Sequence, residues 1–416
     1  MNETEPGDII RALLDKGVNI PAPMSIEISP EVRIDRISGD GVTLHRGCRI
    51  SGEETFIGPG VVLGEEAPMT VDSCQLAKGV RLKGGFAQKA VFLEKAEVGS
   101  GAHLREGTIL EEEASCAHTV GLKQTILLPF VTLGSLINFC DVLMAGGTSR
   151  RDHSEVGSSY IHFNFTPNQD KATASLLGNV PEGVMLDKKP IFLGGQGGLV
   201  GPCHLAFGTV VAAGTLMRKD EETEGRLHFG GAMRAGSVAA PEGIYQNVTR
   251  IVKHNIRYMG NLVALSAWTR QVRSAFVGRA YPKAVHQGHL ANLDRALNER
   301  MKRFRAFAEK LPASLAMGME KGTVPADSSL AAQKKEVTAQ LVAFQEALQA
   351  FAAPGAHPKV PGPFEEVMGQ MAAGAGYIET IHGLDDRERA LGRDWLFDIV
   401  RRTEALGADH FSLTYA

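Results

Sequence analysis

The chemically richest stretch of the sequence is TSRRDHSEVGSSYIHFN, residues 148–164. Arg150 and Arg151 could clamp a phosphate or a carboxylate, because a guanidinium offers paired hydrogen-bond donors. His153 could act as a general base toward an amine, because imidazole titrates near neutral pH. Neighbouring residues of a strand point to opposite sides, so Asp152 need not orient His153. The alternative interpretation of this stretch is a solvated polar loop without a chemical role.

Three polar side chains follow at alternate positions. Tyr160, His162 and Asn164 share one face if the segment is an extended strand. That face is more polar than a structural strand requires, so the pattern indicates a binding surface. It also makes His162 a second candidate for the base.

The sequence offers no convincing metal site. A catalytic zinc ion needs three converging protein ligands, and no spacing links three of the available histidines, which are His118, His153, His162 and His204. We therefore expect no metal. The segment GGQGGLVGP lacks the Lys-Ser/Thr end of a phosphate-binding loop, so its glycines are better explained as corners of a regular coil.

A period of six residues organises the scaffold that must position these side chains. Apolar residues recur at this spacing in two blocks, which are Val80, Phe86, Phe92, Val98, Leu104, Leu110, Cys116, Leu122 and Leu128, and then Leu193, Leu199, Leu205, Val211 and Met217. Neither a helix nor a single strand has this period. It is typical of a solenoid in which each short strand adds one inward side chain to a continuous core. The sequence therefore predicts a mainly β protein built on a parallel β-helix.

The apolar residues at six-residue spacing form a ladder, and this ladder with its interruptions divides the chain into three parts. Residues 1–25 are predicted to be a short helical lead, residues 26–240 the β-helix and residues 241–416 an α-helical domain. Between Asp141 and Pro190 the ladder breaks, so a loop or distorted coils must leave the solenoid there. Such interruptions of a regular scaffold often carry function.

Helical spacing is clearest at the start of the third part, in the apolar residues Val248, Val252, Ile256, Met259 and Val263. The basic residues among them, such as Arg250 and Arg273, either form the solvated side of a helix or bind nucleotide phosphates or an acidic partner. We expect this domain to cap the C-terminal end of the solenoid, where strand edges would otherwise be exposed.

Composition excludes several classes of protein. The chain is 44% hydrophobic and 22% charged, with a net charge of −3, which argues against bulk binding to nucleic acid or anionic membranes. The N-terminus lacks the regions of a signal peptide, and no apolar run reaches the ~18 residues of a membrane span. We expect a cytoplasmic protein with neither a nucleic-acid nor a membrane partner.

Two motifs resemble those of a known family. GLVGPCHLAFGTVVAAGTLMRKD (198–220) is similar to the last coils of left-handed β-helix acyltransferases with hexapeptide repeats. SEVGSSYIHFNFTPNQDKATASLLG (154–178) is similar to the substrate loop in the acetyltransferase domain of the bacterial bifunctional glucosamine-1-phosphate acetyltransferase/N-acetylglucosamine-1-phosphate uridyltransferase. The resemblance covers about residues 26–240 and implies a left-handed coil, a homotrimer with active sites between subunits, and acetyl-CoA as co-substrate. The nucleotidyltransferase loop of those proteins does not occur ahead of the solenoid.

The resemblance assigns roles to individual binding residues. Asn164, followed by Phe165, stands where the family has an Asn-Tyr pair, and Lys171 lies about one position from the lysine that contacts the substrate phosphate. Ala213 matches the small residue beside the pantetheine arm of CoA. Gly195 stands where the family has a serine that contacts CoA.

The general base departs from the family pattern. The position of the catalytic histidine falls on Gly147, and a glycine cannot take a proton. An active enzyme must therefore use another base, and His153 and His162 are the candidates.

These observations lead to two hypotheses about function. The first is acyl-CoA-dependent transfer, with acetyl-CoA as the expected donor, to the amine of an amino-sugar phosphate or nucleotide sugar. The second is a catalytically silent trimer of the same fold that binds a sugar nucleotide or serves as a scaffold. Gly147 and the lost tyrosine hydroxyl favour the second hypothesis, whereas the retained Asn164 and the polar stretch favour the first.

Overall fold

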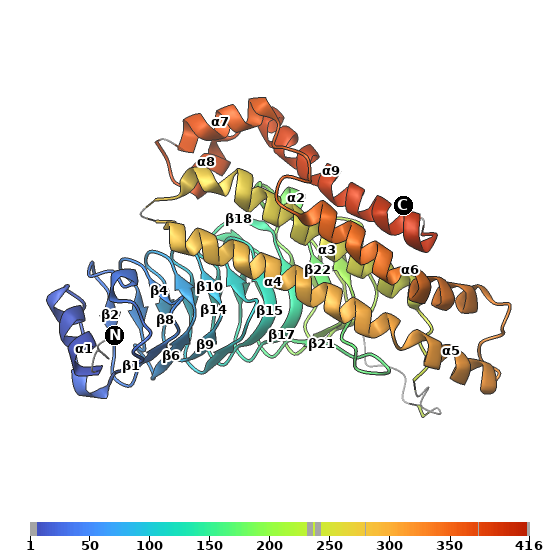
Figure 1. Ribbon diagram of the computed structural model, residues 1–416, viewed down its shortest axis with the longest axis horizontal. Helices are drawn as coiled ribbons and strands as arrows, with labels where there is room; N and C mark the ends of the chain where they lie inside the picture. The colour runs from blue at the N-terminus through green and yellow to red at the C-terminus, as the bar shows by residue number, and fades with distance from the viewer. Residues whose placement is uncertain (1–5, 231–235, 238–242, 279, 373, 414–416) are drawn as a thin grey trace.

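The computed structural model describes residues 6–413 except 231–235, 238–242, 279 and 373. Its N-terminal part is a long parallel β-helix, and most of its helices lie along one flank of that solenoid (Figure 1). The predicted β-helix followed by a helical region is confirmed. None of the described helices is long and apolar enough to cross a membrane.

The described strands, apart from the two of a separate hairpin, stack in parallel register on three faces of the solenoid. The first face holds β1 (Glu27–Ile28), β3 (Arg49–Ser51), β6 (Met69–Asp72), β9 (Gly85–Gln88), β12 (Ala102–Leu104), the first halves of β15 (Gly121–Leu127) and β17 (Asn138–Met144), β21 (Ile161–Phe163), β24 (Gly198–Val200) and β27 (Leu216–Met217). The second face holds β4 (Phe56–Ile57), β7 (Gln75–Leu76), β10 (Val91–Phe92), β13 (Ile109–Leu110), the second halves of β15 and β17, β22 (Ser175–Leu177) and β25 (His204–Leu205). The third face holds β2 (Thr43–Leu44), β5 (Val62–Leu63), β8 (Arg81–Leu82), β11 (Glu97–Val98), β14 (Ser115–Cys116), β16 (Thr132–Leu133), β20 (Glu155–Val156), β23 (Phe192–Leu193), β26 (Val210–Val211) and β28 (Leu227–His228).

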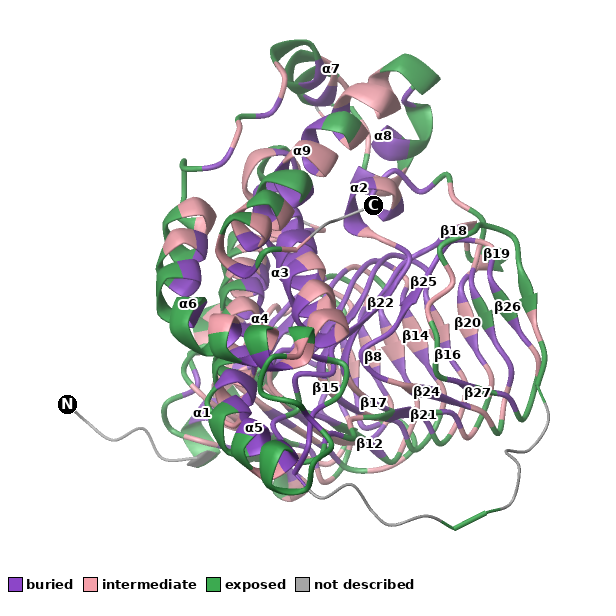
Figure 2. Ribbon diagram, turned by 90° about the vertical axis from the view of Figure 1, so that its right-hand side faces the viewer, coloured by how far each residue is buried: buried purple, intermediate pink, exposed green. Residues whose placement is uncertain are grey.

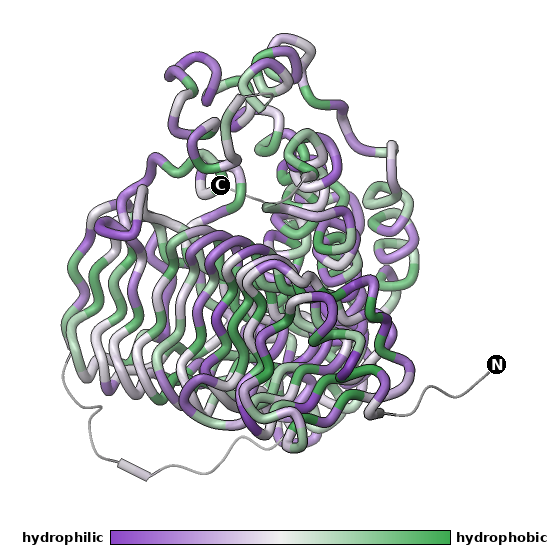
Figure 3. Tube along the Cα trace, turned by 90° about the vertical axis from the view of Figure 1, so that its left-hand side faces the viewer, coloured by the Kyte–Doolittle hydropathy of each residue, from purple (hydrophilic) through white to green (hydrophobic). Residues whose placement is uncertain are grey.

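The inward side chains form the expected ladder. Leu76, Phe92 and Leu110 are partners in successive coils of the second face, and all three are buried. Hydrophobic positions recur in register from coil to coil (Figure 3). Phe86 is an exception to the prediction, because the inward position of β9 belongs to Ala87 and the Phe86 ring lies outside against His103, with ring centroids 5.0 Å apart. The predicted ladder is also displaced at Val80 and Leu128, because the core partners of Val98 and Leu110 in the neighbouring coils are Leu82 and Leu127.

The second face is apolar on its outer side as well. The outward residues that precede the core ladder stack in register and are buried, and they are Val91, Ile109, Ile126, Leu143 and Leu176. On the third face, by contrast, most strands alternate between a partly exposed and a buried residue. A strand with two apolar sides needs a second layer, and Figure 2 shows the helices lying over this part of the solenoid.

The described helices are α1 (Pro6–Asp15), α2 (Val180–Gly183), α3 (Val248–Gln271), α4 (Lys283–Ala308), α5 (Leu311–Glu320), α6 (Ser329–Ala352), α7 (Gly362–Ala372), α8 (Tyr377–Gly383) and α9 (Asp386–Phe411). Helix α1 packs at the N-terminal end of the solenoid, whereas α3 and α4 supply the second layer over the second face. Helix α4 packs on β7 and β10, and α3 packs on β22 and against α9. The expectation of a C-terminal cap is therefore wrong, because the apolar surface that needs covering is a side of the solenoid. The predicted boundary between residues 240 and 241 lies outside the described residues.

The close stacking of coils leads to a testable consequence at Gly194. A Cβ atom there would lie 2.3 Å from the backbone nitrogen of Ala213 in the next coil. We expect Gly194→Ala to lower the free energy of unfolding by about 1–3 kcal/mol, because overpacking forces the coils apart. Gly369→Ala in α7 is the matched control, since its Cβ would meet nothing within 4 Å. The control should be neutral or stabilising by up to about 1 kcal/mol. Equal unfolding midpoints for both variants in urea would contradict this account.

Candidate functional site

A short hairpin leaves the solenoid where the ladder breaks. Strands β18 (Gly147–Ser149) and β19 (Asp152–His153) pair antiparallel, between β17 on the first two faces and β20 on the third. Gly147 lies directly opposite His153 in this pair. Residues opposite each other in an antiparallel pair project to the same side of the pair. The hairpin therefore places the imidazole of His153 on the side to which a side chain at position 147 would point.

The hairpin also explains why residue 147 is a glycine. Its φ is +100°, and a Cβ atom would lie 2.5 Å from the Cα of His153. A histidine at position 147 is therefore incompatible with this backbone. The hairpin therefore accounts both for the glycine at position 147 and for the position of His153 opposite it.

A backbone contact sets the orientation of the His153 ring. Its Nδ1 lies 2.9 Å from the carbonyl oxygen of Arg150, and the side chain is partly exposed. Because a carbonyl only accepts hydrogen bonds, Nδ1 carries the proton in the neutral ring and Nε2 keeps its lone pair. His153 is thus oriented as a proton acceptor at Nε2.

Arg150 extends from the hairpin over the third face. Its Nη1 donates to the carbonyl oxygens of Glu113 (3.0 Å) and Phe130 (3.2 Å) and to the hydroxyl of Thr132 (2.9 Å). These contacts engage one nitrogen and leave the opposite edge of the guanidinium for a ligand. Arg151 is exposed at the tip of the hairpin.

The Arg150 side chain borders a polar groove of about 510 Å³ on the third face, whose lining includes Lys83, Glu97, His118, Thr132 and Glu155. Within it, Lys83 is paired with Glu66 and Glu97. His118 Nδ1 lies 2.8 Å from the Ser135 hydroxyl. Such a lining of hydroxyl, carboxylate and cationic groups is suited to a polar ligand.

The predicted binding face of Tyr160 and His162 points the other way. Both side chains are buried inside the solenoid, whereas Ile161 and Phe163 are exposed. His162 Nε2 lies 2.8 Å from the Ser175 hydroxyl, and burial lowers the pKa of His162 to about 4. The prediction that side chains alternate along β21 is therefore correct, but the face predicted to bind ligand is the buried one. Tyr160 and His162 do not reach the surface.

The loop that follows β21 is held by the helical region. The carbonyl oxygen of Lys171 accepts a hydrogen bond from Arg300 of α4 (3.3 Å), and Tyr245 donates a hydrogen bond to Asp170. Asn164 is partly buried and accepts a hydrogen bond from Thr173 (2.9 Å). The predicted substrate residues Asn164 and Lys171 thus lie in a segment that docks helices, while Arg150 and His153 share the hairpin.

The two positions assigned to CoA lie on one corner of the solenoid. Ser158, Gly195 and Ala213 occupy this corner in consecutive coils, and Gly214 donates its backbone N–H to the Gly195 carbonyl (2.9 Å). Ala213 is exposed and Gly195 partly exposed. The corner therefore presents a narrow strip of backbone without bulky side chains.

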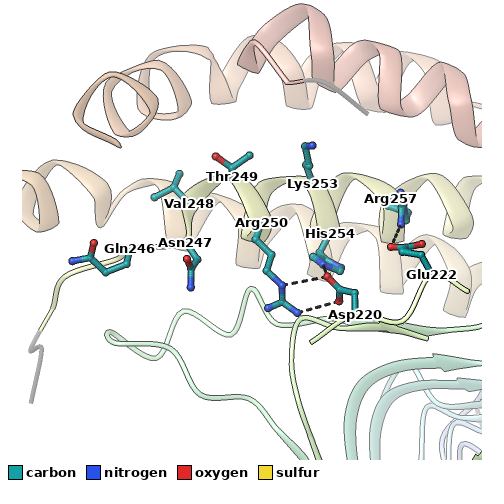
Figure 4. Close-up of a pocket in the computed structure, with 10 residues that line it drawn as sticks. All are labelled: Asp220, Glu222, Gln246, Asn247, Val248, Thr249, Arg250, Lys253, His254 and Arg257. Atoms are coloured by element: carbon teal, nitrogen blue, oxygen red, sulfur yellow. Dashed lines mark hydrogen bonds and ion pairs between the residues drawn. The ribbon is translucent and has the colours of Figure 1, made fainter. Parts of the chain in front are cut away.

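A cavity of about 630 Å³ at the start of α3 was not anticipated from the sequence (Figure 4). Asp220 accepts hydrogen bonds from Arg250 (3.0 Å) and His254 (3.0 Å), and Glu222 pairs with Arg257 (3.0 Å). Burial opposes ionisation of Asp220, but the contacts with His254 and Arg250 outweigh it and hold its pKa well below the usual range. These pairs join the last coils to α3, so the side of this helix that was predicted to face solvent forms in part an ionic contact with the solenoid. In the sequence, only the helical spacing of the basic residues indicated that they share one side of the helix.

Among the residues that the structure describes, no group of three or more histidine, cysteine, aspartate or glutamate side chains is arranged to hold a metal ion.

Comparison with known proteins gives an independent view of the solenoid. The chain is 26% identical over 214 residues to the bifunctional protein GlmU of Thermotoga petrophila, 25% identical over 215 residues to that of Geotalea uraniireducens, and 26% identical over 213 residues to that of Pelobacter propionicus. Each match covers 51% of this chain, and the chain spans about two fifths of the length of these relatives. No family model matches the chain. Over about half its length, the chain resembles the hexapeptide-repeat acetyltransferase domain of GlmU proteins.

Proposed function

We propose that this protein is an acyl-CoA-dependent N-acyltransferase. The donor is acetyl-CoA, and the acceptor is the amine of an amino-sugar phosphate or of a nucleotide sugar. The observation that carries the proposal is the hairpin, which supplies an oriented imidazole beside the position where the resembling family has its histidine. Similarity to GlmU proteins over the solenoid supports the same reaction class.

Each residue of the hairpin has a distinct role in this reaction. The free edge of Arg150, together with Arg151, holds the phosphate of the acceptor through charge-assisted hydrogen bonds. His153 Nε2 takes a proton from the amine as the nitrogen attacks the thioester carbonyl. The new amide bond forms as the carbon–sulfur bond breaks, and the proton passes to the departing thiolate of CoA. Because a thioester is already activated, much of the rate enhancement comes from alignment of the two substrates.

The backbone strip at Gly195 and Ala213 fits the pantetheine arm of acetyl-CoA. The arm is long and thin, and a corner without bulky side chains lets it lie against the coil. The hydrogen bond that a serine would supply at position 195 is missing, so we expect weaker CoA binding than a serine would give.

We propose that the protein works as a homotrimer in the cytoplasm. The outer sides of the last coils carry exposed apolar residues, which are Ile161, Phe163, Phe192, Val210, Leu216 and Leu227. Exposed apolar patches of this kind commonly mark protein interfaces. Their concentration in the last coils supports an interface next to the hairpin and the proposed CoA strip.

Thermal stability in the presence of ligands tests this function. At about 100 times its dissociation constant, acetyl-CoA should add about 2.7 kcal/mol to the stability of the folded protein, which gives a clear rise in Tm. Addition of glucosamine 1-phosphate or another amino-sugar phosphate should then release free CoA, measured as thiol. Stabilisation by a sugar nucleotide alone, with no CoA released from any amine tested, would instead identify a binding protein or scaffold.

A further inference from the structure

Three carboxylates line the groove on the third face beside Arg150, and they differ in their partners. Glu97 lies 2.6 Å and Glu66 lies 3.6 Å from the ammonium of Lys83. Among the residues that the structure describes, none forms a hydrogen bond or an ion pair with the carboxylate of Glu155. Glu155 therefore presents a negative charge to the groove without a cation of the protein beside it.

The strand that carries Glu155 places its side chain on the same side as His153. Burial alternates along this segment, because His153 and Glu155 are partly exposed whereas Ser154 and Val156 are buried. The Ser154 hydroxyl points into the solenoid, where it donates to the carbonyl oxygen of Ala145 (2.8 Å). The Cα atoms of residues i and i+2 in an extended segment lie about 6.6 Å apart. The carboxylate of Glu155 and the imidazole of His153 therefore project close to each other from the outer surface.

The neighbouring coil connects Glu155 with Arg150. Thr132 of β16 is the register partner of Glu155, and its hydroxyl accepts a hydrogen bond from Nη1 of Arg150 (2.9 Å). Adjacent coils lie about 4.8 Å apart, the spacing of paired strands. Arg150 thus contacts the solenoid one coil away from Glu155, so one small ligand can reach both side chains.

The three side chains offer different chemistry to such a ligand. The guanidinium of Arg150 binds a phosphate, and an ionised carboxylate at Glu155 accepts hydrogen bonds and attracts a cation. The lone pair of His153 Nε2 takes a proton. A cationic amine satisfies the charge of Glu155, whereas a hydroxyl in the same place offers one neutral donor and leaves that charge uncompensated.

We propose that Glu155 holds the amine of the acceptor beside Nε2 of His153 and thereby selects an amine over a hydroxyl as the group that is acylated. This inference rests on the proposed acyltransferase function and adds to it the residue that recognises the acceptor nitrogen.

The role of Glu155 is compatible with the proton balance of the reaction. The amine enters the groove as an ammonium, releases one proton to solvent and keeps one N–H donated to Glu155. Its lone pair then forms the bond to the thioester carbonyl carbon, while His153 takes the other N–H proton. The carbon–sulfur bond breaks, the thiolate of CoA receives the proton from His153, and the remaining N–H of the new amide still faces Glu155.

Binding of a matched pair of sugars, without acetyl-CoA, tests this role. Glucosamine 1-phosphate and glucose 1-phosphate differ in having an amine or a hydroxyl on one carbon. In isothermal titration calorimetry, we expect the wild-type protein to bind the amine about tenfold or more tightly, the contribution of a hydrogen bond to a charged group. In Glu155→Gln this preference should disappear, while the affinity for glucose 1-phosphate stays unchanged.

A carboxylate outside the groove provides the matched control. Glu94 is partly exposed on the solenoid and pairs with Lys78 at 3.5 Å, so Glu94→Gln should keep the wild-type preference for the amine. Glu155→Asp keeps the charge and should retain part of the preference. Because Glu155 is partly exposed on the outer surface, Glu155→Gln should unfold in urea at the wild-type midpoint.

Two results of the binding experiment would overturn the proposal. One is a wild-type protein that does not distinguish the two sugars, and the other is a preference for the amine that survives in Glu155→Gln. CoA release separates these results from failure of the acyltransferase function. Release by Glu155→Gln with the wild-type KM for glucosamine 1-phosphate would disprove the role of Glu155 and leave the reaction standing. Amine-selective binding that requires Glu155, without CoA release from acetyl-CoA, would instead support the amine site and contradict the acyltransferase function.

Discussion

Replacement of Arg300 by methionine is expected to lower the free energy of unfolding by about 3–5 kcal/mol, because it leaves a buried carboxylate without its partner. Arg300 projects from α4 and donates a hydrogen bond of 2.6 Å to Asp141 of β17, and both side chains are buried. Burial raises the pKa of Asp141 even with Arg300 in place. The same guanidinium donates to the carbonyl of Lys171, so the loop would lose a contact as well. Chemical denaturation at fixed protein concentration measures the loss.

The neighbouring arginine provides a matched control. Arg303 lies one turn from Glu299 on the same helix and pairs with it at 2.7 Å in a partly exposed position. Such a helical pair contributes about 0.3–0.5 kcal/mol, so Arg303→Met should have little effect on unfolding. A loss of stability in Arg300→Met no larger than that of the control would show that the buried pair does not hold α4 on the solenoid.

Replacement of His153 by glutamine is expected to slow CoA release about 10²–10⁴-fold, the usual contribution of a general base. The glutamine amide has no basic nitrogen and cannot take the proton of the amine. Binding of acetyl-CoA, measured by thermal shift, should be unchanged, because His153 acts on the acceptor side of the reaction. The measurement is the rate of thiol release at saturating acceptor.

An exposed histidine elsewhere on the solenoid serves as the control. His103 lies on the outer side of the first face against Phe86, so His103→Gln should leave CoA release unchanged. If His153→Gln were as active as the wild type, the base would have to be another group. His162 would be a poor replacement, because it is buried and its pKa is about 4.

The helical layer over the second face was not predicted from the sequence. Val91, Ile109 and Ile126 precede ladder residues, and their apolar character could have predicted a covering layer. The expectation of a C-terminal cap came instead from the general need of solenoids to protect their ends. An apolar surface indicates that something covers it, but its sequence does not say which segment does so.

The candidate site was also predicted only in part from the sequence. Arg150, His153 and the break in the ladder were visible in the sequence, since they form one short polar stretch. The inward direction of Tyr160 and His162 was not visible, because a strand's period of two fixes alternation but not which side is the core. The pairing of Gly147 with His153 depends on a hairpin turn, which a search for family residues alone does not reveal.

The sequence by itself determined the β-helix, the helical region and the location of the polar stretch. Each depends on contacts between residues close in the chain or at a regular spacing, so the pattern of side-chain types carries the information. Only the tertiary structure decided which face the helices cover and which charges they bury. Arg273 meets Glu111 and Arg300 meets Asp141 across about 160 residues, and a charged residue in a sequence looks the same whether its partner is water or a buried carboxylate far along the chain.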